Sequence, residues 1–177
     1  MSNIKLENVR ISFPYLFEKS SFENSDPKYK AHFIVQKGSP ADKLIREQIE
    51  EAGKAKHGAK WAQVEKGIVG NNMKYVYQPG ENKGYGEDSM YLSTSSKVMP
   101  SVFHKNAVRA TADNNPVYSG CYVDAVVSIF ATSQGGIAAG LMGVRFIDDG
   151  EAFGGGRAAT AEDFGFEEAH DVDPLTA

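Results

Sequence analysis

Aromatic residues stand beside cations and glycines at four places in this 177-residue sequence. The four segments are Lys28-Tyr29-Lys30, Lys74-Tyr75-Val76-Tyr77, Lys83-Gly84-Tyr85-Gly86 and Phe103-His104-Lys105. Aromatic rings stack on the exposed bases of a single-stranded nucleic acid, and Lys or Arg neutralises its phosphates. The pattern therefore favours a surface that binds single strands. The third segment is the strongest candidate, because a Tyr between two glycines in a long loop is hard to assign to a core.

We take the candidate DNA contacts from these segments and from the strand and loops beside them. They are Lys28, Tyr29, Lys30, Lys74, Tyr75, Tyr77, Lys83, Tyr85, Tyr91, Lys97 and Lys105. Each pair also has a purely structural explanation, because Tyr is a good strand residue and Lys a good surface residue. We assign Phe13 and Leu16 to the core rather than to base stacking.

Sequence motifs typical of enzymes are missing. The sequence has no GxxxxGK[ST] phosphate loop and no GxSxG nucleophile elbow. Its four histidines, His32, His57, His104 and His170, lack the spacing of a zinc site. The single cysteine, Cys121, lies in an apolar strand and is expected to be buried. We therefore predict a protein without catalysis, cofactor or metal.

The net charge of −4 divides unevenly along the chain. Residues 1–147 hold 18 Lys and Arg against 14 Asp and Glu, whereas residues 148–177 hold one Arg against nine acids. This asymmetry suggests a nucleic-acid-binding domain over residues 1–150 and a flexible acidic tail over residues 151–177. The bland alternative is a tail that only improves solubility.

The sequence also carries signals for location. No apolar run approaches the roughly 20 residues of a membrane span, and residues 1–10 do not resemble a signal peptide. A lone cysteine is typical of a reducing compartment. We expect a cytoplasmic protein with no membrane partner.

Hydrophobic periodicity predicts a mainly β fold. The expected strands are 4–13 with a bulge and an end at Pro14, 28–36, 72–78, 90–97, 117–131 with a bulge at Gly120, and 137–147. One helix is expected from Pro40 to Gly58, with Ser39 as its N-cap, and a short second helix around Trp61. Residues 15–27 are expected to form a loop. These elements predict a five-stranded OB-like antiparallel barrel with an α-helical insertion and a disordered acidic C-terminal tail.

Three segments then resemble a known family. SFPYLFE at 12–18, YSGCYVDAVVSIFA at 118–131 and GIAAGLMGVRFIDDGEAFGGG at 136–156 are similar to the phage single-stranded-DNA-binding family long classed as a domain of unknown function. The similarity covers most of residues 5–156. It implies an OB-fold that binds single-stranded DNA without sequence preference in replication or recombination, followed by an acidic tail.

Two other functions remain open on the sequence. One is a phage structural or protein-interaction module, and the other is a small nucleotide-processing enzyme. The tail suggests contacts with replication or recombination proteins. The oligomeric state, a dimer included, and the preference for DNA over RNA are not determined.

The acidic segment predicts an internal competitor for DNA. A tethered segment of net charge −8 has a high effective concentration near a basic groove, of roughly millimolar order. Truncation after Gly156 should therefore tighten single-strand binding several-fold at low salt, and the gain should shrink at high salt as charges are screened. Anisotropy titrations at two salt concentrations measure this. Equal affinities of the two proteins at low salt would contradict the competition.

Overall fold

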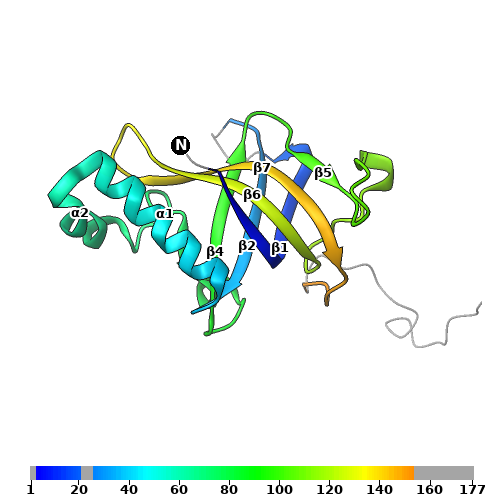
Figure 1. The fold of residues 1–177 in the computed structure, drawn as a ribbon, viewed down its shortest axis with the longest axis horizontal. Coiled ribbons are helices and arrows are strands. Elements are labelled where there is room, and N and C mark those ends of the chain that lie inside the picture. Colours follow the sequence, from blue (N-terminus) through cyan, green and yellow to red (C-terminus); the bar gives the residue numbers. More distant parts are fainter. Residues whose placement is uncertain (1–2, 21–25, 154–177) are drawn as a thin grey trace, which may run out of the picture.

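The computed structural model describes residues 3–20 and 26–153 and confirms the predicted barrel (Figure 1). Its strands are β1 (Asn3–Ser20), β2 (Lys28–Gln36), β3 (Tyr77–Pro79), β4 (Ser89–Ser96), β5 (Ser101–Phe103), β6 (Tyr122–Ala131) and β7 (Ile137–Asp148). Its helices are α1 (Pro40–His57) and α2 (Trp61–Ile68), with short 3-10 turns at Gly58–Lys60, Gly80–Lys83 and Ala112–Asn114.

Five of the strands, β1, β2, β4, β6 and β7, close the barrel. The sheet runs β3-β4-β2-β1-β6-β7-β5, and a parallel pairing of β4 with β7, at Ser95 and Gly140, joins its two halves. All other pairings among the five barrel strands are antiparallel. This is the strand connection of an OB-fold, with α1 and α2 inserted between β2 and β4. In Figure 1 the two helices lie at one end of the molecule and β5 lies at the other.

β1 is longer than the sequence predicted and bends twice. Register shifts fall between Leu6 and Val9, between Ser12 and Tyr15 and between Tyr15 and Ser20. At the first two, Asn8 and Phe13 adopt positive φ values of 52° and 50°. The predicted end of the strand at Pro14 is wrong, because Pro14 lies in the second bulge, where no ladder hydrogen bond requires its missing N–H. Residues 15–20 are consequently strand rather than loop.

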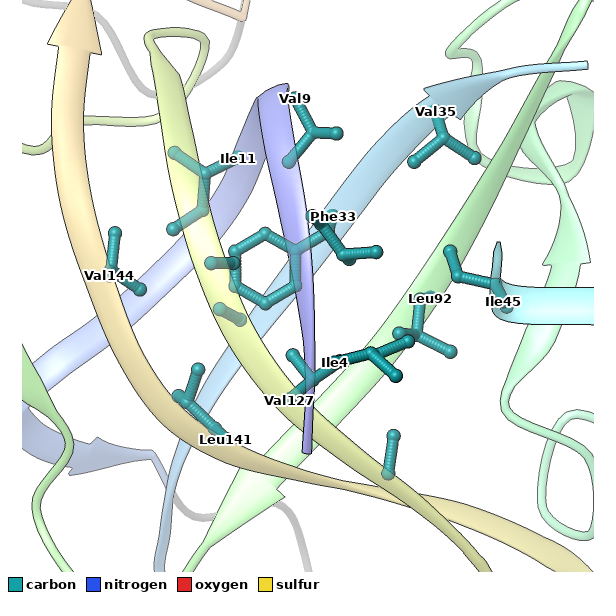
Figure 2. Packing of buried hydrophobic residues seen from close by; sticks show 14 of the residues in the cluster. Ile4, Val9, Ile11, Phe33, Val35, Ile45, Leu92, Val127, Leu141 and Val144 are labelled. Atoms are coloured by element: carbon teal, nitrogen blue, oxygen red, sulfur yellow. The ribbon is translucent and has the colours of Figure 1, made fainter. Parts of the chain in front are cut away.

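The core lies inside the barrel and continues beneath α1. Figure 2 shows Phe33, Leu92, Val127 and Leu141 converging between the strands, with Ile45 of α1 close by. All five side chains are buried. On β2 the predicted alternation is confirmed: Ala31, Phe33 and Val35 face inward, while the Lys28–Lys30–His32 face stays partly exposed. Burial of these apolar side chains positions the strands whose opposite faces meet solvent.

The helical insertion follows its sequence signals. The Ser39 side chain accepts a hydrogen bond from the Asp42 backbone N–H, Pro40 begins α1, and Gly58 caps its end with a φ of 59°. Asp42 accepts hydrogen bonds from the Gly38 N–H, the Arg46 side chain and the Tyr77 hydroxyl. Burial opposes ionisation of Asp42, but these bonds outweigh it and lower its pKa. α1 is thereby tied to β3, which begins at Tyr77.

Other predicted boundaries move. The strand expected over 72–78 is reduced to β3 and an isolated bridge at Tyr75, and residues 117–121 precede β6 rather than belonging to it. β5 was not predicted at all. Cys121 is buried, as expected. The helices in the described ranges, 3–20 and 26–153, include none long and apolar enough to span a membrane. The predicted tail beyond Phe153 lies outside those ranges.

A pair of helical glycines tests the packing of the insertion. A Cβ at Gly53 would lie 2.1 Å from the buried ring of Trp61, whereas a Cβ at Gly67 would meet nothing within 4 Å. Gly53→Ala should lower stability by about 1–3 kcal/mol through overpacking. Gly67→Ala should raise it by about 0.5–1 kcal/mol through helix propensity. Urea unfolding measures both, and a Gly53→Ala protein as stable as the parent would contradict the packing.

Candidate nucleic-acid interface

The outer face of β1, β2, β4 and β6 gathers side chains that the strand register places together. Arg10 of β1 pairs with Tyr122 of β6 on one side and with Ile34 of β2 on the other, and Ile34 pairs with Tyr91 of β4. Directly paired residues share a face of a sheet. Because Val9, Ile11 and Phe33 occupy the interior, the paired set faces outward.

Rings and one guanidinium form a continuous row across this face. We call it the aromatic row; its members are, in spatial order, Tyr122, Arg10, Phe153, Tyr85, Tyr91, His32 and Phe13. Successive members lie between 4.2 and 5.8 Å apart, measured between ring centroids or from the guanidinium carbon to a centroid. Those members that are not buried offer flat surfaces on which nucleobases can stack.

Tyr85 enters the row from the loop between β3 and β4. Gly84 and Gly86 on either side of it have φ values of 76° and 109°, which L side chains rarely adopt. The Tyr85 hydroxyl donates a hydrogen bond to Ser12 Oγ at 2.9 Å, and its ring contacts Tyr91 and Phe153. The loop therefore lies over the outer face, and this explains why Ser12 and Tyr91 are buried although they point outward.

A basic groove adjoins the row at His32. Its volume is about 390 Å³, and it runs along β2 and β4 between Lys28, Lys30 and His32 on one strand and Ser93 and Ser95 on the other. Met73, 88% exposed, stands at its edge. Lysines on one strand that face small hydroxyl side chains on the next strand are suited to contact a phosphate backbone.

A larger groove of about 610 Å³ lies at the other end of the row. Arg10 and Tyr122 line it together with Lys5, Glu7 and Leu44 near the start of α1. Two cations and one carboxylate line it, as Lys28, Lys30 and Asp26 line the basic groove. The aromatic row thus extends from one groove to the other.

The pKa of His32 reflects the burial and the charges at the place where the aromatic row meets the basic groove. Burial, followed by the nearby charges of Lys83 and Lys30, lowers this pKa from 6.5 to about 4. The imidazole is therefore neutral at pH 7 and stacks on Tyr91 with centroids 5.1 Å apart. Two lysines from separate elements consequently direct positive potential at the place where the row meets the groove.

The segment Asp149–Phe153, which we call the strap, completes the row. The Tyr118 hydroxyl donates to Asp149 Oδ1 at 2.9 Å, and the Phe153 N–H donates to the Ser119 carbonyl at 3.3 Å. A Cβ at Gly120, whose φ is 110°, would lie 2.3 Å from the Glu151 carbonyl oxygen. The strap can approach the barrel this closely only because residue 120 is glycine.

Several of the residues predicted from the sequence come together on this face. Lys28 and Lys30 line the basic groove, Lys83 lies near His32, and Tyr85 belongs to the aromatic row. Tyr29 points to the other face of β2, where Lys19 Nζ lies 5.7 Å from its ring centroid.

The structure corrects three of the predicted aromatic contacts. Tyr75, Tyr77 and Tyr91 are 6%, 2% and 2% exposed. The Tyr75 hydroxyl donates to Glu65 and that of Tyr77 to Asp42, and burial followed by these bonds raises both pKa values. Tyr75 and Tyr77 are core residues, and Tyr91 is covered by Tyr85 and His32. None of the three can offer its ring to a base in this structure.

The remaining predicted cations lie apart from the row. Lys74 is exposed beside Met73, and its carbonyl accepts the Ile137 N–H at the start of β7. Lys97 follows β4 directly. Lys105 lies beyond β5, where its carbonyl accepts from the Arg145 side chain. The structure does not bring Lys105 to the groove.

Sequence reasoning missed five members of the row, which are Arg10, Phe13, His32, Tyr122 and Phe153. Phe13 is 50% exposed, so its assignment to the core is wrong, whereas Leu16 is buried as predicted. Arg10 could have been found from its alternation with Val9 and Ile11. Tyr122 and Phe153 lie in the segments that carry the family resemblance, but no spacing rule indicates that they meet.

Comparisons with known proteins find a family and a relative that this chain resembles. Residues 2–175 match the family described as Enterobacter phage Enc34, ssDNA-binding protein. A protein named p50 from Acyrthosiphon pisum secondary endosymbiont phage 1 is 37% identical over 171 residues, covering 91% of each chain.

Two solved structures are also similar. The single-stranded DNA-binding protein of bacteriophage Enc34, in complex with ssDNA, has a TM-score of 0.68 and 25% identity, covering 86% of this chain and 89% of that one. The single-stranded DNA-binding protein gp2.5 of bacteriophage T7 has a TM-score of 0.57 and 10% identity, covering 90% of this chain and 99% of that one, and shows the fold alone.

The His32 environment predicts a pH dependence of stability. Because the unfolded chain takes up a proton near pH 6.5 and the folded one only near pH 4, the free energy of unfolding should fall as pH drops through this window. The loss due to His32 is at most about 3 kcal/mol. Urea unfolding at pH 7 and pH 4.5 should show a smaller loss for His32→Gln than for the parent. Equal losses would contradict the assigned environment.

Proposed function

This chain belongs to the Enc34 single-stranded-DNA-binding protein family, and we propose that it binds single-stranded DNA, without sequence preference, along the outer face of its barrel. The observation that carries the proposal is the junction of the aromatic row with the basic groove at His32. Bases stack on the row while phosphates follow the lysines of the groove.

The proposed contacts are a subset of those expected from the sequence, with additions from the structure. Lys28, Lys30, Lys83 and Tyr85 come from the sequence, and Arg10, Phe13 and His32 are added from the structure. Single strands are favoured over duplex because only unpaired bases expose the flat faces that the row requires. No base-edge readout is needed, so binding is independent of sequence.

The proposal extends to the setting of this activity. The protein coats single strands during phage DNA replication or recombination in the host cytoplasm and acts by binding rather than by catalysis. The acidic segment beyond Phe153 recruits proteins of the same process. Family membership and the DNA-bound Enc34 relative support this extension.

Titration against a labelled oligo-dT and a duplex of equal length tests the proposal. The single strand should bind more tightly, and the logarithm of its binding constant should fall with log salt by about 0.7 per phosphate neutralised. Tyr85→Ala should weaken binding by about 1–3 kcal/mol through lost stacking. Lys83→Ala should reduce the salt slope by about 0.7. Fluorescence anisotropy at two salt concentrations measures all three.

Tyr77→Phe is the matched control. It removes the buried hydroxyl that donates to Asp42, so it should lower the melting temperature and leave DNA affinity unchanged. Equal affinity of the parent for duplex and single strand would refute the proposal. A Tyr85→Ala protein that binds like the parent would remove the row from the interface.

A further inference from the structure

Phe153 occupies an unusual place between two groups suited to hold a nucleobase. The Arg10 guanidinium carbon lies 4.2 Å from the centroid of the Phe153 ring, and the Tyr85 ring lies 5.4 Å away with the two planes at 50°. Guanidinium planes and tyrosine rings are the surfaces on which proteins stack unpaired bases. Phe153 is itself a flat ring of similar kind.

Arg10 is held by hydrogen bonds to two backbone carbonyls. Its Nε donates to the Gly120 carbonyl at 3.0 Å, and one terminal nitrogen donates to the Glu151 carbonyl. These bonds fix the plane of the guanidinium. With its plane fixed and the Phe153 ring already against it, Arg10 presents a surface on which a flat ring can stack.

The strap that carries Phe153 is anchored upstream of it rather than at it. Tyr118 bonds to Asp149 and also to the carbonyl and the N–H of Gly150, and Gly150 approaches Gly120 closely. Phe153 itself is bound by ring contacts and by one long N–H bond to Ser119 of 3.3 Å. The ring can therefore leave while the strap anchor remains in place.

Resting on the proposed function, we propose that Arg10 and Tyr85 form a nucleobase-stacking slot which Phe153 fills until a base of the bound strand replaces it. The ligand is any unpaired base, because the slot offers flat faces and no edge readout. Exchange moves Phe153, the last described residue, off the face and shifts the point from which the acidic segment 154–177 departs.

The exchange of Phe153 for a base differs from charge competition in its dependence on salt. Competition by the acidic segment weakens with salt, whereas competition by an uncharged ring does not. Phe153→Ala should therefore tighten binding to oligo-dT by roughly three- to tenfold, if the slot is open between a tenth and a third of the time, at low and high salt alike. Anisotropy titrations of the full-length protein measure the change.

Two further variants make the outcome decisive. In a Tyr85→Ala background, Phe153→Ala should bring no gain, because the slot no longer exists. Phe153→Trp, which places a larger stacking ring in the slot, should weaken binding, and its emission should shift to longer wavelength when oligo-dT displaces the indole. This variant gives a result even if Phe153→Ala fails to fold.

The possible failures are distinct. A folded Phe153→Ala protein that binds with the parent's affinity, or more weakly, overturns the slot while the proposed function stands. A Phe153→Trp protein with unchanged affinity and unchanged emission does the same. If the parent itself fails to bind oligo-dT, the proposed function falls and the slot falls with it.

Discussion

The path of β1 is the constraint on which the rest of the structure depends. β1 pairs with β2 along one edge and with β6 along the other, so the barrel closes only if this strand bends. The bulge at Asn8 shifts the alternation, after which Val9 and Ile11 point inward and Arg10 points outward. The second bulge leaves Phe13 exposed in a left-handed conformation that costs about 1–3 kcal/mol. The bends that close the barrel therefore also place Arg10 and Phe13 on its outer face.

The segments that resemble the phage family make structural sense as one unit. Gly120 and Gly150 permit the close approach of the strap, and Tyr118 anchors it. These residues need not touch DNA themselves. Their effect is to deliver Phe153 and the Glu151 carbonyl to Arg10, which fixes the guanidinium plane within the aromatic row. A motif can therefore be necessary for an interface while lying behind it.

The sequence predicted the elements whose signals are local. The alternation of β2 and the Ser39 cap of α1 follow from neighbouring residues alone, and both are confirmed. The end of β1 at Pro14 was wrong because β1 continues to pair with β2 beyond a bulge, which no local rule reveals. β5, only three residues long, carries too little pattern to detect.

The candidate site was harder to predict, because exposure is a property of the whole fold. Tyr77 and Tyr85 look alike in the sequence, because each stands near a lysine. Yet Tyr77 is buried and donates a hydrogen bond to Asp42 of α1, whereas Tyr85 lies over the outer face of the barrel. The difference depends on the helical insertion and on a loop between two glycines. Lys30 and Lys83, by contrast, were predicted as contacts from their place beside aromatic residues, and both lie near His32. Burial, assisted by their charges, keeps this imidazole neutral, so that it serves the row as a flat ring and leaves the phosphates to the lysines.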